Sequence, residues 1–415
     1  MPAPKPDLRL NLDRARQVFL AAQGFPARAE SSERILEETG FVRTLGGVDV
    51  YIAVRARRPG MRRADLDEAV EERAAQVVPS VRGCMYLVPR RDVPLALRAA
   101  DLLSRGRAEK DQQKAGILPG EVEVVAKAVI QVLAEKGPLT TDALRRAMPA
   151  GSVRSLGELG KKVGISSPLP PALRRLEFEG RVERKVESGR LDSERYLWRA
   201  TARSPFDGAG LPDDPIEIYA RLARIFFHCA GLGTQKDFAA WAGIAQRDAK
   251  AAIEKTPVLP VAIEGVDDAH YLLEDRRDLL EKAEEASQAV ALLPFEDNVL
   301  ALHGGPFLMV DPQHHATPVP SWGSSKESTL GDSRHMAMRS VAAEGRVVGF
   351  WEYDPDPREV VVGYFEPIPK EARARIEAEA ADLTRFLNED LGHGRSFSLD
   401  TDDDLRQRSG FVRKM

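Results

Sequence analysis

The sequence has little cysteine, few aromatic residues and no long apolar run, and each shortage excludes a class of protein. Cys84 and Cys229 lie far apart and form no CxxC pair, which excludes a disulfide framework and a zinc ribbon. No stretch approaches the roughly 18 uncharged apolar residues needed to cross a bilayer, and the polar N-terminal segment lacks the apolar region of a signal peptide. We therefore expect a cytoplasmic protein without a membrane partner. We also expect it to be a monomer.

The global charge favours no particular partner. The 415 residues include 60 Lys and Arg against 64 Asp and Glu, so binding to nucleic acid requires a local basic surface. At roughly 150 residues per domain, the length predicts about three domains.

One segment has the element order of a winged helix. Apolar spacing and capping residues predict helices over 121–137, 138–148 and 170–180, followed by a hairpin of strands 181–187 and 194–200. Three helices closed by a hairpin form a winged helix, a variant of the helix-turn-helix. The order recurs more weakly from residue 216, with helices 216–231, 233–244 and 247–256 and strands 258–265 and 270–275, which indicates a tandem structural repeat.

The remaining sequence predicts a strand-rich C-terminal region. Strands are expected at 289–295, 307–311, 345–354 and 359–365, a long helix at 370–392, and a loose tail at the end. We therefore predict an α+β fold of tandem winged-helix modules with a C-terminal strand-rich domain. The expected divisions are a helical or winged-helix-like domain 1–115, a winged helix 116–202, a second winged-helix-like domain 203–287, a β-rich domain with terminal helix 288–398 and a tail 399–415.

Two basic segments are candidates for contact with DNA phosphates. Between Arg154 and Arg199, eleven basic residues face seven acidic ones, and between Arg43 and Arg63, six arginines face one aspartate. Recognition helices and wings use Arg and Lys to contact bases and phosphates, although a solvated charged surface explains such runs as well. The predicted DNA-binding residues are Arg43, Arg55, Arg57, Arg58, Lys161, Lys162, Arg174, Arg175, Arg181, Arg184, Lys185 and Arg190.

Motifs for metal or nucleotide chemistry are absent. The seven histidines lack HExxH spacing, and the pair His314 and His315 is more simply explained as part of a polar loop, so we predict no metal and no cofactor. The carboxylates that could act as general acid or base are Glu296 and Asp297, which follow an apolar strand, and Asp49, which starts a helical run. A turn-forming role for Asp297 and a capping role for Asp49 are the simpler alternatives.

Five stretches occur in order along the chain: RQVFLAAQGF, GPLTTDALRRAM with PLPPALRRLEFEGRVER, GTQKDFAAWAGI, ALLPFEDNVL and EGRVVGFW. Together they resemble the bacterial winged-helix DNA glycosylases of the AlkZ/YcaQ type. The resemblance implies a concave scaffold that grips duplex DNA and hydrolyses the N-glycosidic bond of alkylated purines, including some interstrand crosslinks, without metal or organic cofactor.

The catalytic signature that this resemblance implies is altered here. The family has a Gln, an apolar residue and a second Gln or Asp, and counting back without gaps from RADLDEA places these positions at Arg43, Thr44 and Leu45. Leu45 cannot bind water, and Arg43 places positive charge beside a developing cation. The family mechanism therefore cannot be transferred, and Asp49 is the nearby carboxylate that could substitute.

Three functions remain open at this level. The sequence favours a double-stranded DNA-binding protein on the glycosylase scaffold with the catalytic Gln pair replaced, whose glycosylase activity is near background. One alternative is an active DNA glycosylase using other residues such as Asp49. Another is a transcription-factor-like DNA binder.

Overall fold

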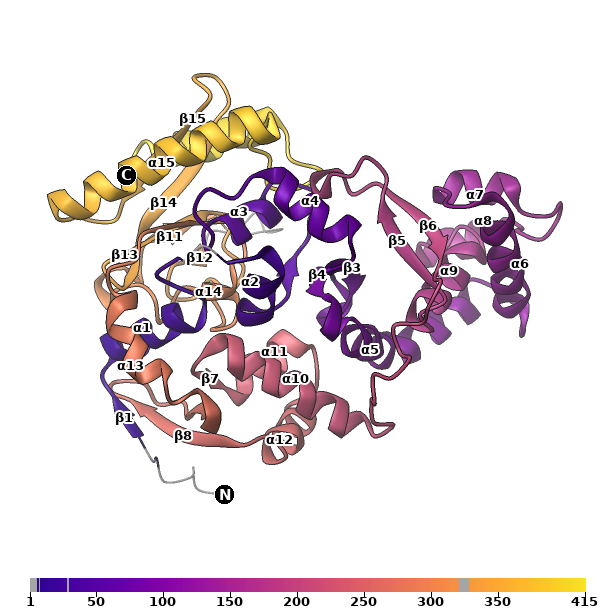
Figure 1. Ribbon diagram of the computed structural model, residues 1–415, viewed down its shortest axis with the longest axis horizontal. Coiled ribbons are helices and arrows are strands. Elements are labelled where there is room, and N and C mark those ends of the chain that lie inside the picture. Colours follow the sequence, from indigo (N-terminus) through magenta and orange to yellow (C-terminus); the bar gives the residue numbers. More distant parts are fainter. Residues whose placement is uncertain (1–5, 7, 28–29, 321–327) are drawn as a thin grey trace.

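The computed structural model describes residues 6, 8–27, 30–320 and 328–415 (Figure 1). It has mixed α and β structure. Buried apolar residues of the described ranges form four clusters, of which three combine distant regions and the fourth lies within residues 125–198. No helix in the described ranges is long and apolar enough to span a membrane.

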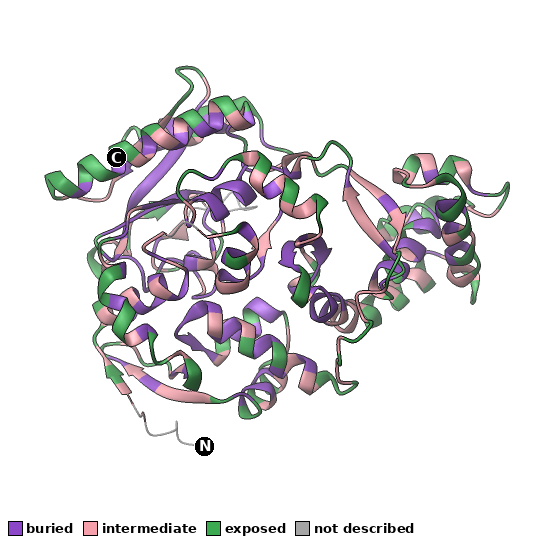
Figure 2. Ribbon diagram, in the orientation of Figure 1, coloured by how far each residue is buried: buried purple, intermediate pink, exposed green. Residues whose placement is uncertain are grey.

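The N-terminal region combines helices with a three-stranded sheet in the order β2-β4-β3. Its buried helix α3 directly follows residues 43–48 and is enclosed along its whole length (Figure 2). The elements are α1 (Leu12–Ala22), α2 (Ser32–Thr39), β2 (Val42–Arg43), α3 (Asp49–Arg55), α4 (Arg63–Glu71), β3 (Ala75–Pro79), β4 (Met85–Pro89) and α5 (Val93–Lys114).

The next region contains the predicted three helices and hairpin, with one further short helix. Its elements are α6 (Glu121–Lys136), α7 (Thr141–Ala147), α8 (Gly157–Val163), α9 (Leu169–Phe178), β5 (Val182–Val186) and β6 (Tyr196–Ala200). Thr140 caps α7 by accepting from the Ala143 amide. Leu139, before α7, pairs with Trp198 on β6, so the hairpin is joined to the helices by backbone hydrogen bonds. Helix α8 was not expected from the sequence.

The third region repeats this order. It contains α10 (Pro215–Ala230), β7 (Gly233–Thr234), α11 (Gln235–Ala242), α12 (Gln246–Glu254), β8 (Val258–Ile263) and β9 (His270–Leu273). Strands β8 and β9 are antiparallel, as the sequence predicts, and β1 (Leu8–Leu10) from the start of the chain pairs in parallel with β8. Helix α13 (Leu279–Ala286) then packs against α1.

A four-stranded antiparallel sheet in the order β10-β13-β14-β15 forms the C-terminal region. The elements are β10 (Ala291–Leu293), α14 (Asn298–Ala301), β11 (Pro318–Val319), β12 (Ser328–Thr329), β13 (Arg339–Ala343), β14 (Arg346–Asp354), β15 (Glu359–Tyr364) and α15 (Lys370–Arg385), which continues as a π-helical turn over Phe386–Leu391. In Figure 1, α15 runs along this sheet.

Two expectations for this region are wrong. Residues 307–311 form turns rather than a strand, because the amides of Met309 and Val310 both bond back to the Pro306 carbonyl. The expected loose tail contains helix α16 (Asp402–Val412), whose N-terminus is capped by a capping box of Thr401 and Asp404. Leu405 and Val412 are buried as α16 packs on β14, so the last helix belongs to the core.

Candidate DNA interface and the region of residues 43–49

The exposed basic residues of the second region lie on its helices. Lys161 and Lys162 are exposed on α8, and Arg174 and Arg175 are exposed on α9. Arg175 pairs with Glu123 and Glu179, and Arg181 lies within 3.6 Å of Glu179. Arg145 and Arg146 on α7 are exposed as well; they lie outside the charged segment that starts at Arg154 and were not predicted. We refer to these six exposed cations of α7, α8 and α9 together as the helical basic face: Arg145, Arg146, Lys161, Lys162, Arg174 and Arg175.

The basic residues of the hairpin have partners inside the molecule. Arg184 donates to Glu177 at 2.7 and 3.1 Å, and its guanidinium lies over the Trp198 ring. Lys185 pairs with Glu71 on α4 at 2.6 Å. Arg190 donates to Asp192 and to the Leu391 carbonyl. The hairpin lies between the helices α6–α9 and the N-terminal region (Figure 1). Arg184 joins it to α9, Lys185 to α4 and Arg190 to the turn that follows α15.

The arginines between 43 and 63 do not form one phosphate-binding surface, which corrects that expectation. Arg57 is 3 % exposed and forms two hydrogen bonds to Asp297, at 2.8 and 2.7 Å. Arg55 is buried against Asp382 and the Met61 carbonyl. Buried guanidinium groups require such partners because a bare charge is costly to desolvate.

Arg58 is more accessible than Arg55 and Arg57. Its side chain is 27 % exposed, pairs with Asp65 at 3.3 Å and donates to Ser32. It stays a predicted DNA contact.

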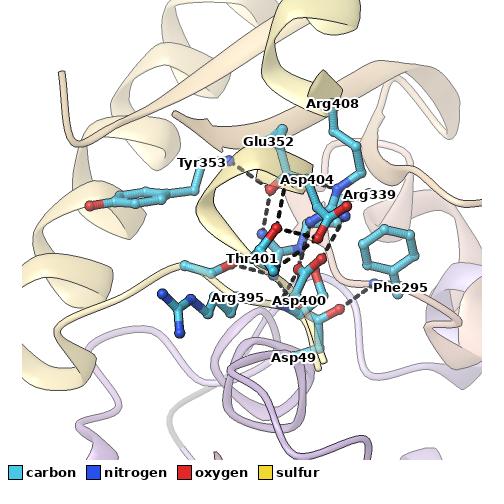
Figure 3. Close-up of polar contacts among 12 residues, drawn as sticks. Asp49, Phe295, Arg339, Glu352, Tyr353, Arg395, Asp400, Thr401, Asp404 and Arg408 are labelled. Carbon is cyan, nitrogen blue, oxygen red and sulfur yellow. Dashed lines mark hydrogen bonds and ion pairs between the residues drawn. The ribbon is translucent and has the colours of Figure 1, made fainter. Parts of the chain in front are cut away.

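Asp49 belongs to a buried ionic network that joins α3 to the C-terminal sheet (Figure 3). Its Oδ2 accepts from the Phe295 amide at 2.9 Å and its Oδ1 accepts from Arg339. Arg339 also donates to Glu352 at 2.7 Å. Burial raises the pKa of Asp49 to about 6, although Arg339 acts in the opposite direction.

The network extends to the last helix. Arg408 on α16 donates to the second oxygen of Glu352 at 2.5 Å and forms two hydrogen bonds to Asp400. Arg339 and Glu352 have fully buried side chains. Both Asp49 oxygens are thus occupied by protein groups, an arrangement that favours a role in holding α3 to the sheet. The catalytic hypothesis for Asp49 stays a prediction.

The three positions assigned to the family signature lie at the end of β2 and just after it. Arg43 forms an ion pair with Glu296, and the Thr44 amide bonds to the Met85 carbonyl on β4. The other oxygen of Glu296 accepts from His335 Nδ1 at 2.9 Å. The positive charge of Arg43 therefore has a carboxylate beside it. This pairing was not predicted from the sequence.

A small cavity of about 20 Å³ lies between these positions and the segment after β10. Its walls include Arg43, Leu45, Asp49, Glu296 and Asp297. A volume of 10–15 Å³ holds roughly one water molecule, so the cavity is far too small for a nucleobase. Asp297, which the sequence suggested as a turn former, accepts from the Val299 amide as the cap of α14.

In the ranges that the structure describes, no group of three or more His, Cys, Asp or Glu side chains is arranged to hold a metal ion. His314 lies 3.4 Å from Glu366, whereas His315 bonds to the Phe307 carbonyl. The two adjacent histidines therefore have separate partners.

The comparison with family models decides the family. The model of the DNA glycosylase AlkZ-like family matches residues 47–386. The chain belongs to the AlkZ-like DNA glycosylase family. The matched range starts two residues after Leu45, so it does not include Arg43, Thr44 and Leu45.

A solved structure supports the same fold. The DNA glycosylase AlkZ of Streptomyces sahachiroi is similar at a TM-score of 0.68 and 17 % sequence identity, over 91 % of this chain and 97 % of that one. No curated protein matches the sequence. The family and its fold thus indicate a function of the DNA-repair glycosylase type, with DNA as the substrate.

Proposed function

We propose that this protein binds double-stranded DNA through tandem winged-helix modules, on the scaffold of glycosylases for alkylated or crosslinked purines, with the family's catalytic Gln pair replaced. The observation that carries the proposal is the family match over residues 47–386. We further expect the protein in the cytoplasm, at the nucleoid.

The order of elements supports the winged-helix interpretation. In each of two consecutive regions, helices precede an antiparallel strand pair. The second of these regions has three helices, α10, α11 and α12, before β8–β9, and the first has α6, α7 and α9 with the short additional helix α8 before β5–β6. Without α8, the two regions have the same order of helices before the strand pair. In a winged helix the third helix enters the major groove. That helix is α9 in the first unit, and it carries the exposed Arg174 and Arg175.

The helical basic face is the surface best suited to phosphates. Its cations reach solvent on three helices, and neutralising a phosphate with an exposed cation releases a condensed counterion. The hairpin residues Arg184, Lys185 and Arg190 are paired with protein groups and only 16 %, 32 % and 33 % exposed. Lys161 and Arg175 are paired too, but they are 74 % and 47 % exposed. Because the hairpin residues are less accessible, we assign them a smaller part in the interface.

An active glycosylase is the second candidate function, and the pairing of Arg43 with Glu296 favours it. The sequence alone predicts activity near background because Arg43 adds positive charge where the sugar becomes cationic. In the structure Glu296 offsets that charge, and it places a carboxylate beside the altered signature.

A competition titration tests the proposed function. Wild-type protein is titrated with a labelled duplex and displaced by unlabelled duplexes of one sequence, either intact or containing N7-methylguanine. A repair scaffold should prefer the duplex containing the lesion. Equal affinity for both duplexes, together with preference for one particular DNA sequence, would support the transcription-factor-like alternative instead.

A further inference from the structure

Three side chains from distant segments meet at the altered signature. Glu296 follows β10, Arg43 ends β2 and His335 precedes β13. Their side chains are 15 %, 24 % and 54 % exposed, respectively. Solvent and a bound substrate can therefore reach this cluster, whereas the Asp49 side chain is 7 % exposed.

The backbone directs Glu296 into this cluster. Its φ is 49°, in the left-handed region that residues with a side chain rarely adopt. Both neighbours are fixed: the Phe295 amide bonds to Asp49, and Asp297 binds Arg57. With both neighbours fixed, this conformation holds the Glu296 side chain beside Arg43 and His335.

The hydrogen bonds define the charge of the cluster. A carboxylate only accepts hydrogen bonds, so His335 Nδ1 must carry the proton that it shares with Glu296. Burial, with the positive charges of Arg82, Arg43 and Arg334, lowers the pKa of His335. At neutral pH the ring is neutral, and the ion pair of Arg43 with Glu296 leaves the cluster without net charge.

A polar atom beside the carboxylate lacks a partner. Arg43 Nε is buried without a hydrogen bond to any described residue. The cavity of about 20 Å³ is bordered by Arg43, Glu296 and Leu45, and it has room for roughly one water molecule. Both oxygens of Glu296 already accept a hydrogen bond, from Arg43 and from His335, and a carboxylate keeps further lone pairs that a water can donate to.

We propose that Glu296 orients and deprotonates the hydrolytic water in this protein, with Arg43 as its positioning residue. This inference rests on the proposed DNA binding and on the second candidate function, the active glycosylase. The water oxygen bonds to C1′ of an alkylated purine nucleotide while the N-glycosidic bond breaks. The bond's electron pair passes to the purine and cancels its positive charge, and the water's proton passes to Glu296. The products are a neutral alkylpurine and an abasic sugar with a 1′-hydroxyl.

The experiment uses a duplex that contains N7-methylguanine and measures abasic-site formation under single-turnover conditions. Wild type is compared with Glu296→Gln, which removes the charge with little change of shape. The matched control is Glu344→Gln. Glu344 lies in the turn between β13 and β14, has a left-handed φ of 51° as well, and also pairs with an arginine, Arg375. Duplex affinity and melting temperature are measured for every variant.

We expect Glu296→Gln to slow abasic-site formation by about 100- to 1,000-fold, the usual cost of losing one preorganised polar group at a reacting centre. Duplex affinity should stay within about twofold, and Glu344→Gln should cleave as wild type. The conservative Arg43→Lys should retain more activity than Arg43→Ala, because it keeps a cation next to the carboxylate. Comparison of the two Arg43 variants tests the cluster even if Glu296→Gln fails to fold.

The outcomes separate this inference from the proposed function. If wild type binds the duplex but forms abasic sites no faster than Glu296→Gln, the inference is wrong and the DNA-binding proposal stands. The inference is also wrong if Arg43→Lys and Arg43→Ala are equally active. If wild type does not bind duplex DNA at all, the proposed function itself is wrong.

Discussion

The run of residues 43–63 and the helical basic face are both rich in basic residues, but the environments of their arginines differ. In the first, Arg55 and Arg57 are buried and bind carboxylates far along the chain. In the second, Arg174 and Arg175 are exposed beside residues of the same region. A local surplus of arginine therefore does not by itself distinguish a phosphate-binding surface from the interior ion pairs that join domains.

The largest expected effect comes from breaking the buried pair of Arg57 with Asp297. Arg57→Ala leaves the Asp297 carboxylate, 1 % exposed, without its cation. Removing one partner of a buried pair costs about 3–5 kcal/mol, to be measured by urea unfolding. Arg385→Ala on α15, where the arginine is 68 % exposed, should cost less than about 1 kcal/mol. Equal losses for the two variants would contradict the assignment of Arg57 to the core.

An intermediate effect is expected at the hairpin. Arg184→Gln removes the charged partner of Glu177, which is 2 % exposed, and should lower the unfolding free energy by about 1–3 kcal/mol. Arg174→Gln, nearby on α9, should leave stability within about 0.5 kcal/mol. If Arg184→Gln weakens duplex binding without loss of stability, the hairpin contributes to the DNA interface after all.

A further effect, which depends on pH, is expected at Asp49. Because burial raises the pKa of Asp49 to about 6, the folded state binds its proton more tightly than the unfolded state does. This contribution to stability is fully present below about pH 4 and is lost as the pH rises through about 6. The amide side chain of the Asp49→Asn variant does not titrate, so that variant lacks this contribution at every pH.

The difference in unfolding free energy between wild type and Asp49→Asn should therefore shrink between about pH 4.5 and pH 7, by roughly 1.4 kcal/mol for each pKa unit of the shift. Urea unfolding of both proteins at several pH values measures this difference. A difference that grows with pH would contradict the raised pKa. Loss of cleavage in well-folded Asp49→Asn would instead favour Asp49 as the catalytic group.

Elements with strong local signals were predictable from the sequence. The helix start at Thr140 and the strand pair Val182–Val186 and Tyr196–Ala200 follow from capping residues and from alternation of apolar side chains. The prediction of a strand at 307–311 was wrong because Leu308, Met309 and Val310 are buried although they lie in a turn. Burial alone does not specify backbone conformation.

The candidate site was predictable only in part. Glu296 was selected as a possible acid or base, but its partners Arg43 and His335 lie 253 and 39 residues away. No local pattern encodes such pairings, because they arise when β2 and the segments flanking the C-terminal sheet come together. His335 carried no motif and was missed. The same reason explains why Arg57, whose partner lies 240 residues away, was mistaken for a surface residue.

The most direct test of the account is the salt dependence of duplex binding by Arg174→Gln/Arg175→Gln. Its matched control is Arg373→Gln/Arg385→Gln, on the exposed side of α15. Each lost phosphate contact should reduce the slope of log affinity against log salt by about 0.9. The account predicts a reduced slope and weaker binding on all sequences for the α9 variant and wild-type behaviour for the control. An unchanged slope for the α9 variant would contradict the assignment of the helical basic face as the DNA-binding surface.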